Sequence, residues 1–349
     1  MTHENQQKKL GELNKCYSMA ELMVDGEPCL LAAAEKQDPC YLFDAAGNRI
    51  DTVWDGPGGV MTMAALPGQD SRFLATRKFY SPNDAAEASI VLAEKTAAGW
   101  DVHPVTDLPF VHRFGLLERN GRHWIIACAL KSGHEHKEDW SKPGAVYGAR
   151  LPEDPKEGIR FQTLMTGLLR NHGYSQTEEG QALIAAENGT FLFTPPAAED
   201  ETWEIRQISA VPSSDSVLLD FDGDGKPELG MISPFHGAAV TIWHLDQDGQ
   251  YVPQWKLPLP EAETEMVHAT WAGVVNGKPS WIVGWRKGTR STIIIRWNPA
   301  RGTYGWEVID TDAGAANALV VTDEHGQQKL ICTNREINEI AQYELKEED

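Results

Sequence analysis

The chain has 349 residues and carries 31 Lys and Arg against 51 Asp and Glu, which gives a formal charge of −20 at pH 7. A chain this acidic, with no basic run, is unsuited to binding nucleic acid, because the phosphate backbone is bound by clustered Lys and Arg. The chain is 41% hydrophobic and long enough to bury a large core, and its 31 Gly, 20 Pro and 12 Trp favour an all-β protein with many turns.

No stretch of the sequence approaches the roughly 20 consecutive apolar residues of a membrane helix. Residues 1–9 lack the apolar segment of a signal peptide. We therefore expect no membrane partner and a cytoplasmic location. The cysteines form no Cys-x-x-Cys pair and predict buried free thiols in a reducing compartment; they are Cys16, Cys29, Cys40, Cys128 and Cys332.

A turn followed by a short apolar strand recurs along the whole chain. The turns lie at Gly26, Asp70, Gly121, Gly180, Gly225, Gly277 and Gly326. Their spacing is close to roughly 50 residues, the length of one blade of a β-propeller. We predict an all-β fold in which residues 1–349 form a single seven-bladed β-propeller of four-stranded antiparallel blades. The blades are expected to start near residues 15, 59, 110, 169, 213, 264 and 313.

Each unit continues with further short apolar or alternating segments that are typical of strands between neighbouring blades. The predicted third strands lie at 41–43, 90–92, 145–147, 191–193, 240–243, 293–297 and 340–345, and the predicted fourth strands at 51–54, 102–105, 161–164, 203–208, 252–257 and 306–309. The seventh unit ends after its third strand. We expect the segment around residues 9–14 to supply the missing outer strand and close the ring, which removes an exposed sheet edge. Rings of six or eight blades are the structural alternatives.

Residues 220–228 form an acidic turn with the sequence Asp-Phe-Asp-Gly-Asp-Gly-Lys-Pro-Glu. Carboxylates at positions 1, 3, 5 and 9, with Gly at 6 and a backbone carbonyl at 7, suit Ca²⁺. The predicted ligands are Asp220, Asp222, Asp224, the carbonyl of Lys226, and Glu228. The turn resembles the calcium loop of FG-GAP/VCBS repeats, whose members form seven-bladed propellers, and this resemblance implies a structural Ca²⁺. The alternative is a solvated acidic turn that holds no ion.

The first strand of each propeller blade lines the central channel, and functional residues are expected where these strands begin. Positions nine residues before the turns, or eight in the fourth unit, are Tyr17, Met61, His112, His172, Ser216, His268 and Asn317. Three histidines that converge on one axis suit Zn²⁺ or Mn²⁺ with an open coordination position. We predict a transition-metal site at His112, His172 and His268; the alternative is hydrogen-bonded histidines that fill a polar channel.

The loops between second and third strands should open on the same face, and they are rich in His and Arg despite the acidic composition. This excess of cations predicts a small anionic ligand, a single sugar or an oligosaccharide. The predicted substrate-binding residues are Arg77, Lys78, His236, Trp285, Arg286, Asn317 and Arg335. The predicted catalytic residues are His134 or His136 as the base, Tyr174 in reserve, and Arg113, which would orient the anionic group.

These residue types on a propeller are similar to those of propeller-fold polysaccharide and oligosaccharide lyases, some of which hold Mn²⁺ with histidines, and to the propeller domain of an aldos-2-ulose dehydratase. The resemblance implies a metal-dependent carbohydrate lyase or dehydratase that acts by β-elimination on an anionic or keto sugar. Such a reaction needs a base of near-neutral pKa and a cation beside the developing enolate.

Two other functions remain open from the sequence. One is a non-catalytic propeller that binds a glycan or a protein. The other is a propeller-fold glycoside hydrolase, which needs two carboxyl groups at the site; they could come from Glu135, Glu138, Asp139, Glu187 and Glu336. No glycine-rich phosphate loop follows a strand and opens a helix, so we expect no organic cofactor.

Overall fold

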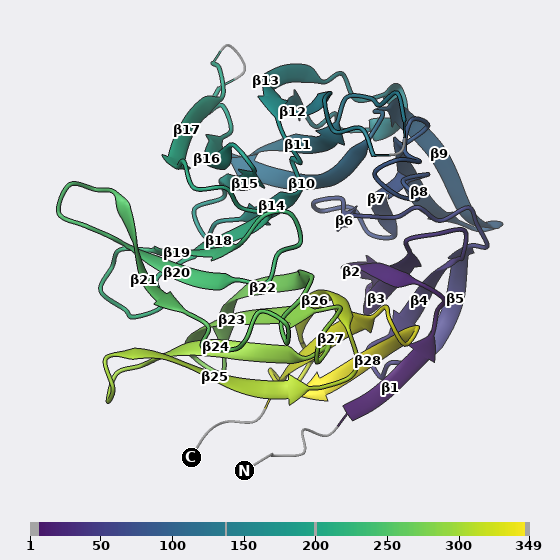
Figure 1. Ribbon diagram of the computed structural model, residues 1–349. Helices are drawn as coiled ribbons and strands as arrows, with labels where there is room; N and C mark the ends of the chain where they lie inside the picture. Colours follow the sequence, from purple (N-terminus) through teal and green to yellow (C-terminus); the bar gives the residue numbers. More distant parts are fainter. Residues whose placement is uncertain (1–6, 137, 199–200, 346–349) are drawn as a thin grey trace.

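The computed structural model describes residues 7–136, 138–198 and 201–345. Over these residues 28 strands form seven four-stranded antiparallel sheets, which are arranged as a ring (Figure 1). The seven-bladed propeller predicted from the repeat is therefore confirmed. The described part of the chain has one short 3₁₀ helix, η1 (Pro155–Glu157), and no helix there is long and apolar enough to span a bilayer.

In every blade the strands run from the axis outward in the same order. The inner strands, which contact one another around the axis, are β2 (Cys16–Val24), β6 (Met63–Ala65), β10 (Val111–Arg119), β14 (Gly173–Gln176), β18 (Asp215–Leu219), β22 (Val267–Val275) and β26 (Ala315–Thr322). The second strands are β3 (Glu27–Ala34), β7 (Arg72–Arg77), β11 (Arg122–Lys131), β15 (Ala182–Ala186), β19 (Glu228–Ile232), β23 (Lys278–Trp285) and β27 (Gln328–Asn334).

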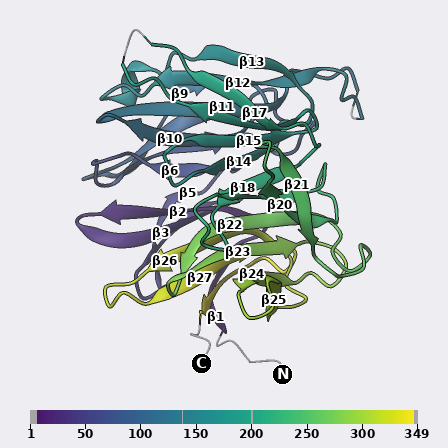
Figure 2. The ribbon, with the colours of Figure 1, turned by 90° about the vertical axis from the view of Figure 1, so that its left-hand side faces the viewer.

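The outer half of each blade consists of a third and a fourth strand. The third strands are β4 (Cys40–Asp44), β8 (Ser89–Thr96), β12 (Pro143–Arg150), β16 (Gly189–Thr194), β20 (Val240–Leu245), β24 (Thr292–Asn298) and β28 (Glu339–Glu344). The outermost strands are β5 (Arg49–Trp54), β9 (Gly99–Asp107), β13 (Gln162–Leu168), β17 (Glu204–Ser209), β21 (Tyr251–Lys256), β25 (Thr303–Asp310) and β1 (Gln7–Glu12). Figure 2 shows the ring from the side, where the strands of neighbouring blades lie in successive layers.

The core of the protein lies between the blades. Among the described residues the buried apolar side chains form seven clusters, and each cluster joins at least two neighbouring blades; Leu31 of β3 and Phe73 of β7, for example, share one. A second strand is covered on both faces, which explains why its sequence is a continuous apolar run such as Ala182–Ala186. All five cysteines are buried free thiols, as predicted.

The N-terminal strand closes the ring. Strand β1 pairs antiparallel with β28, with Gln7 opposite Tyr343 and Glu12 opposite Glu339, and the N–H of Leu13 donates to the carbonyl of Asn338 (3.0 Å). The prediction that the N-terminal segment supplies the missing outer strand is confirmed, although the strand ends two residues earlier than expected. We call the joint between the last and the first blade the seam.

The two ends of the propeller carry different loops. The start of β18 pairs with the end of β19, since Asp215 lies opposite Ile232. The beginnings of inner strands and the loops between second and third strands therefore meet at one end, which we call the channel mouth. The acidic turn 220–228 joins β18 to β19 and lies at the opposite end.

Removal of residues 1–12 tests the closure. The truncated chain loses the five cross-strand pairs of β1 with β28. Because each pair contributes ~0.2 to 1 kcal/mol, we expect the free energy of unfolding to fall by about 1 to 5 kcal/mol. Urea unfolding and size-exclusion chromatography should show a less stable protein that self-associates through the exposed β28 edge. Lys9→Ala, which keeps the backbone pairing, should unfold like the wild type; a truncated chain of unchanged stability would contradict the closure.

Candidate functional site

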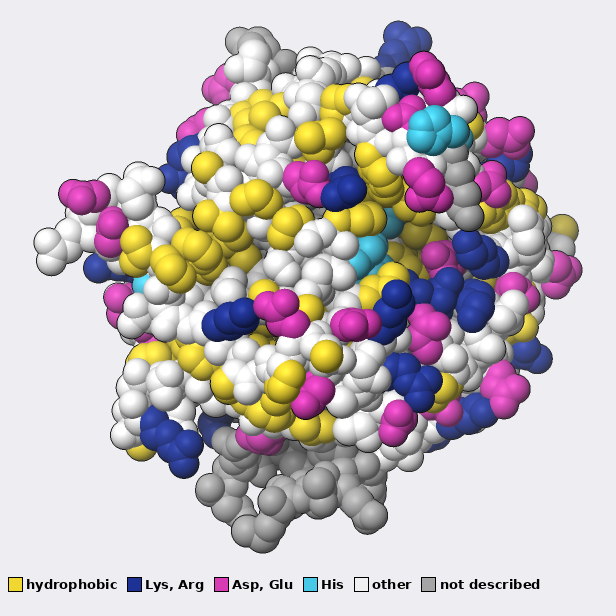
Figure 3. All heavy atoms as spheres, viewed as in Figure 1, with side chains coloured by type: hydrophobic (Ala, Val, Ile, Leu, Met, Phe, Trp, Pro, Cys, Tyr) yellow, Lys and Arg dark blue, Asp and Glu magenta, His cyan; other side chains and the backbone are white. Residues whose placement is uncertain are grey.

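Four histidines meet at the channel mouth. His112, His172 and His268 stand where the inner strands β10, β14 and β22 begin, and His236 comes from the loop between β19 and β20. The ring centroid of His172 lies 4.4 Å from that of His236 and 4.5 Å from that of His112. The ring centroids of His236 and His268 are 4.7 Å apart. Figure 3 shows histidine side chains at the centre of this face, with Lys and Arg gathered beside them.

Three of these histidines can hold a metal ion. One nitrogen of each of His172, His236 and His268 lies within 4.8 Å of the others, a spacing compatible with shared coordination. We call these three residues the histidine cluster. The cluster differs from the predicted set of metal ligands in one residue. It contains His236, which was expected to bind substrate, and does not contain His112. His112 instead packs between His172 and the ring of Phe79 (5.0 Å).

His172 is oriented by a buried carboxylate. Its Nδ1–H donates to Oδ2 of Asp215 (2.9 Å), which also accepts the hydroxyl of Ser214 (2.9 Å). Asp215 is 2% exposed and His172 is fully buried. The Nε2 of His172 has no hydrogen-bond partner among the described residues, so the carboxylate leaves that atom available to a ligand.

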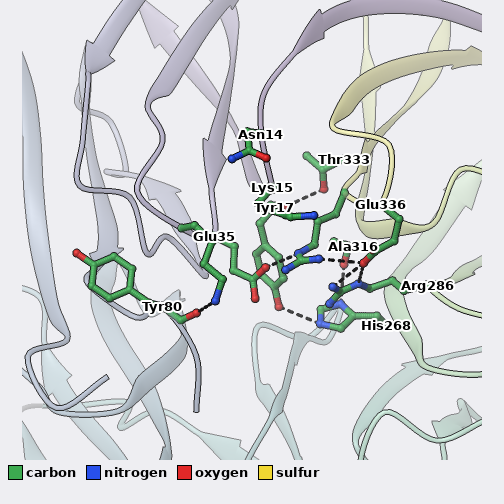
Figure 4. Close-up of polar contacts among 12 residues, drawn as sticks. Asn14, Lys15, Tyr17, Glu35, Tyr80, His268, Arg286, Ala316, Thr333 and Glu336 are labelled. Atoms are coloured by element: carbon green, nitrogen blue, oxygen red, sulfur yellow. Dashed lines mark hydrogen bonds and ion pairs between the residues drawn. The ribbon is translucent and has the colours of Figure 1, made fainter. Parts of the chain in front are cut away.

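His268 is oriented by the backbone. Its Nδ1–H donates to the carbonyl of Ala316 (2.7 Å), so its Nε2 accepts the hydroxyl of Tyr17 (3.0 Å; Figure 4). Burial raises the pKa of Tyr17 to about 12, and the phenol stays a donor at neutral pH. The Tyr17 hydroxyl therefore lies at the atom through which His268 would coordinate an ion.

Burial also determines the charge of three histidines at the mouth. It lowers the pKa of His112, His236 and His268 well below the ordinary histidine value, and the neighbouring histidines and arginines lower it further. These rings are therefore neutral at pH 7. A neutral imidazole is the form that binds a metal or accepts a proton.

Arg113 is the guanidinium most directly associated with this group. It donates to the carbonyl of Met61 (2.8 Å) and to Oδ1 of Asn317 (3.4 Å), and it lies over the ring of Tyr17 (5.6 Å). No described carboxylate lies within ion-pair distance of Arg113, so its positive charge is not neutralised locally. Asn317 in turn donates to the carbonyl of Tyr17 (2.8 Å), which holds these residues together.

Arg286 and Arg335, both predicted substrate ligands, are tied to glutamates. Arg286 donates through Nε and Nη2 to one oxygen of Glu336 (2.7 Å each), and Arg335 donates to the same oxygen (3.0 Å; Figure 4). Arg335 also pairs with Glu35 across the seam. Burial acts to raise the pKa of Glu336, but the two guanidiniums hold it below its ordinary value. This network is balanced in charge and is suited to holding the loops of the mouth in place.

Two other predicted substrate ligands belong to the second blade. Arg77 is half-buried at the end of β7 with its guanidinium over the ring of Trp54 (4.6 Å), and burial lowers its pKa. Lys78 forms an exposed ion pair with Glu87 (3.2 Å). Neither has a described contact with the histidine cluster.

The predicted bases lie apart from the cluster. His134 is half-buried against Phe110 (5.7 Å) and His136 is exposed, both in the loop between β11 and β12. Tyr174 packs in the core between the third and fourth blades, where its hydroxyl lies against Gly115. Burial there raises the pKa of Tyr174, which is the opposite of what a base requires.

Trp285 was predicted to offer a stacking surface, but the structure buries it. The side chain is 1% exposed, and its indole N–H donates to Oγ1 of Thr289 (2.9 Å). It belongs to the apolar cluster between the fifth and sixth blades. Trp285 therefore stabilises the fold and does not face a ligand.

The carboxyl groups proposed for glycoside hydrolysis do not form a catalytic pair. Glu187 and Glu336 are bound to arginines, and Asp139 accepts backbone N–H groups of Glu135 (2.9 Å) and Ser141 (2.8 Å). The Ser141 hydrogen bonds hold the pKa of Asp139 below its ordinary value. The general acid of that reaction needs a raised pKa, and these environments favour the charged form.

Sequence reasoning missed three residues of the mouth. Asp215 directly precedes Ser216 in the inner-strand alignment, Tyr17 occupies an aligned position to which no role was given, and Glu35 lies in the loop after β3. The alignment of inner-strand positions therefore pointed to Asp215 and Tyr17. Nothing in it distinguished Glu35 from other acidic loop residues.

At the opposite end, the carboxylates of the acidic turn converge. Oxygens of the four predicted acidic ligands lie within 4.8 Å of one another; they belong to Asp220, Asp222, Asp224 and Glu228. Asp224 accepts the N–H of Lys226 (2.8 Å), whose carbonyl was the fifth predicted ligand. Nδ1 of His244, which the sequence did not suggest, lies 3.8 Å from Asp222. The binding of Ca²⁺ here stays a prediction.

Comparison with known proteins places the fold. No family model matches the chain, and a search of curated proteins finds no match. A streptogramin B lyase structure is 13% identical with a TM-score of 0.54, over 98% of each chain. The periplasmic gluconolactonase of Pseudomonas aeruginosa is 11% identical with a TM-score of 0.58, over 95% of this chain and 92% of its own. At these identities the likeness shows the propeller fold alone, and membership of the FG-GAP/VCBS family stays a prediction.

Asp215→Ala tests the orientation of His172. The substitution removes the acceptor of the Ser214 hydroxyl and leaves the buried Nδ1–H of His172 with only its longer contact to the Ser214 carbonyl (3.3 Å), which costs about 1 to 3 kcal/mol of unfolding free energy. Urea denaturation measures this loss. Asp312→Ala is the matched control, because it removes an exposed partner of Arg290 and should cost less than about 1 kcal/mol. Equal stability of the two variants would show that the buried contact contributes nothing.

Proposed function

We propose that the protein is a metal-dependent carbon–oxygen lyase or dehydratase that acts by β-elimination on a small anionic or keto sugar at the channel mouth. The observation that carries the proposal is the histidine cluster, in which Asp215 holds Nδ1 of His172 and the Ala316 carbonyl holds Nδ1 of His268. Arg113, which no described carboxylate neutralises, supplies the positive charge next to it.

The donor set fits a borderline divalent ion. Three imidazole nitrogens suit Zn²⁺ or Mn²⁺, and an ion with three protein ligands keeps an open position. His172, His236 and His268 would hold the ion, which when bound would supply positive charge next to the carbonyl oxygen of the substrate. The Tyr17 hydroxyl, which donates to Nε2 of His268 in the structure, would then be free to donate to the substrate.

The residues of the chain can bind the substrate and move its protons. Arg113 would bind the carboxylate or keto oxygen and orient the sugar. His112 is neutral, and its Nδ1 has no partner among the described residues, so it can accept the proton from the carbon next to the carbonyl, although burial makes it a weaker base than an ordinary histidine. The electron pair of that C–H bond forms the new double bond, the C–O bond breaks, and the Tyr17 phenol can protonate the leaving oxygen.

Two features favour this reaction over the alternatives. Two arginines hold the pKa of Glu336 below its ordinary value and Arg170 pairs with Glu187, which disfavours glycoside hydrolysis with Glu336 as the general acid. One propeller of similar fold bears the name of a lyase and another that of a gluconolactonase. These names support the view that a propeller scaffold can carry an enzyme active site. A non-catalytic sugar-binding role differs from our proposal in having no turnover.

Turnover of sugars tests the proposal. Protein loaded with Zn²⁺ or Mn²⁺ is screened against uronate oligosaccharides and keto sugars, and the absorbance of the unsaturated uronate or enone is followed. We expect a signal that a chelator abolishes. His112→Ala should lower kcat by about 10² to 10⁴, and Arg113→Gln should raise KM about tenfold or more.

Arg290→Gln is the control, because it removes an arginine that pairs with Asp312 outside the histidine cluster. It should turn over like the wild type. The proposal fails if the loaded protein produces no unsaturated product from the whole panel, or if His112→Ala and Arg113→Gln are as active as the wild type. Release of acid from a sugar lactone without the chromophore would replace elimination with hydrolysis.

A further inference from the structure

The histidine cluster is largely closed to solvent. His172 is fully buried and His268 is 2% exposed, and Nε2 of His172, the atom left available to a ligand, is itself buried without a partner among the described residues. His236 is half-buried, but its Nδ1 is buried in the same way. An ion or a small molecule therefore cannot reach Nε2 of His172 unless a side chain that covers it moves.

Phe235, an aromatic residue in the loop between β19 and β20, packs on the cluster. Its ring centroid lies 5.3 Å from that of His172 and 4.2 Å from that of His236. It also meets the ring of Trp140 edge to face at 5.4 Å, and the guanidinium of Arg170 lies over both Trp140 (5.2 Å) and Phe235 (5.7 Å). Phe235 is half-buried while His172 is fully buried, which places Phe235 between His172 and solvent.

The backbone that carries Phe235 is anchored on either side of the ring but not at it. The N–H of Gly237 donates to the carbonyl of Ser233 (3.1 Å), and the N–H of Val267 donates to the carbonyl of Gly237 (3.0 Å). Between these anchors Phe235 and His236 form no backbone hydrogen bond with a described residue. His236 is also in the left-handed region (φ 54°), which costs a non-glycine residue free energy. Residues 234–236 are therefore held in place chiefly by side-chain contacts.

Phe79, the ring that packs on His112, is held differently. Its N–H donates to the carbonyl of Gly59 (3.1 Å), and its side chain is buried. Displacing Phe79 would break that hydrogen bond and expose a buried ring. Displacing residues 234–236 breaks no backbone hydrogen bond of Phe235 among the described residues and moves a ring that is already half-exposed. Segments with few backbone hydrogen bonds and few buried contacts open most readily, so the cover opens first at Phe235.

We propose that residues 234–236 form a gate over the histidine cluster. In the closed state Phe235 packs against His172 and keeps solvent from its Nε2. In the open state the segment swings about its anchors at Ser233 and Gly237, and the cluster becomes accessible to an ion or a small sugar. The role of the gate in turnover rests on the proposed function, whereas the motion itself does not.

Reaction with diethyl pyrocarbonate tests the gate, because this reagent acylates accessible neutral imidazoles and peptide mass spectrometry measures each histidine separately. In the metal-free wild type, His172 should react much more slowly than the exposed His325. Phe235→Ala removes the cover and should speed the reaction of His172 about tenfold or more. Thermal unfolding of each variant verifies that it is folded.

Gly237→Ala tests the hinge while leaving Phe235 in place. A Cβ atom at position 237 would clash with the hydroxyl and the carbonyl of Ser233, so the anchor of the closed state has to shift. His172 should again react about tenfold faster or more. Gly305→Ala is the matched control, because a Cβ atom there meets no atom within 4 Å and its backbone is not in the left-handed region. Its His172 should react like that of the wild type.

The gate is overturned if His172 of the wild type reacts as fast as His325, or if Phe235→Ala leaves the rate of His172 unchanged. It is also overturned if Phe235→Ala speeds the reaction and Gly237→Ala does not, since Phe235 would then be a fixed cover without a hinge. None of these measurements needs a metal or a sugar. A protein without lyase activity can therefore still have the gate, and an active lyase whose His172 reacts at one rate in all variants would keep its function and lose the gate.

Discussion

The channel mouth depends on the closure of the ring. Strand β1 pairs with β28, and this pairing fixes the first blade against the last, so that residues about 300 positions apart in sequence meet across the seam. Asn317 and Thr333 both donate to the carbonyl of Tyr17, at 2.8 Å each, and Arg335 pairs with Glu35 (Figure 4). Tyr17 then reaches His268 in the sixth blade. A ring left open at the seam would lose these contacts, and His268 would lose the hydrogen bond from Tyr17.

Desolvation explains the electrostatics of both ends of the molecule. At the mouth, burial keeps His236 and His268 neutral, while Arg286 and Arg335 are balanced by Glu336 and Glu35. Arg113 is left as the positive group beside the cluster. At the other end, burial raises the pKa of Glu228 in the acidic turn to about 7. The average charge of −20 therefore conceals local sites of either sign.

The fold was predictable because the repeat is strong and a propeller allows one arrangement of it. The repeat also placed Tyr17, His112, His172 and His268 at the axis, since equivalent inner-strand positions converge by geometry alone. It placed His236 on the same face as a substrate ligand, but it did not predict that His236 joins the histidine cluster, because its loop backbone adopts a left-handed conformation (φ 54°) that no periodicity reveals.

Side-chain direction accounts for the residues that were misplaced. Tyr174 follows Gly173 in a strand where successive side chains point to opposite faces, and its own face is the core between two blades. Trp285 ends a buried strand and stays within the apolar cluster. Asp215 was overlooked because its partner, His172, comes from the neighbouring blade, and one sequence does not show which side chains of two blades pair.

The most direct test of the account is the metal content of three purified proteins after loading with Zn²⁺ or Mn²⁺ and desalting: the wild type, His236→Ala and His112→Ala. The account predicts about one more bound ion per chain in the wild type than in His236→Ala, and wild-type content in His112→Ala. A wild-type protein that retains no transition metal, or a His236→Ala variant that retains as much as the wild type, would contradict it.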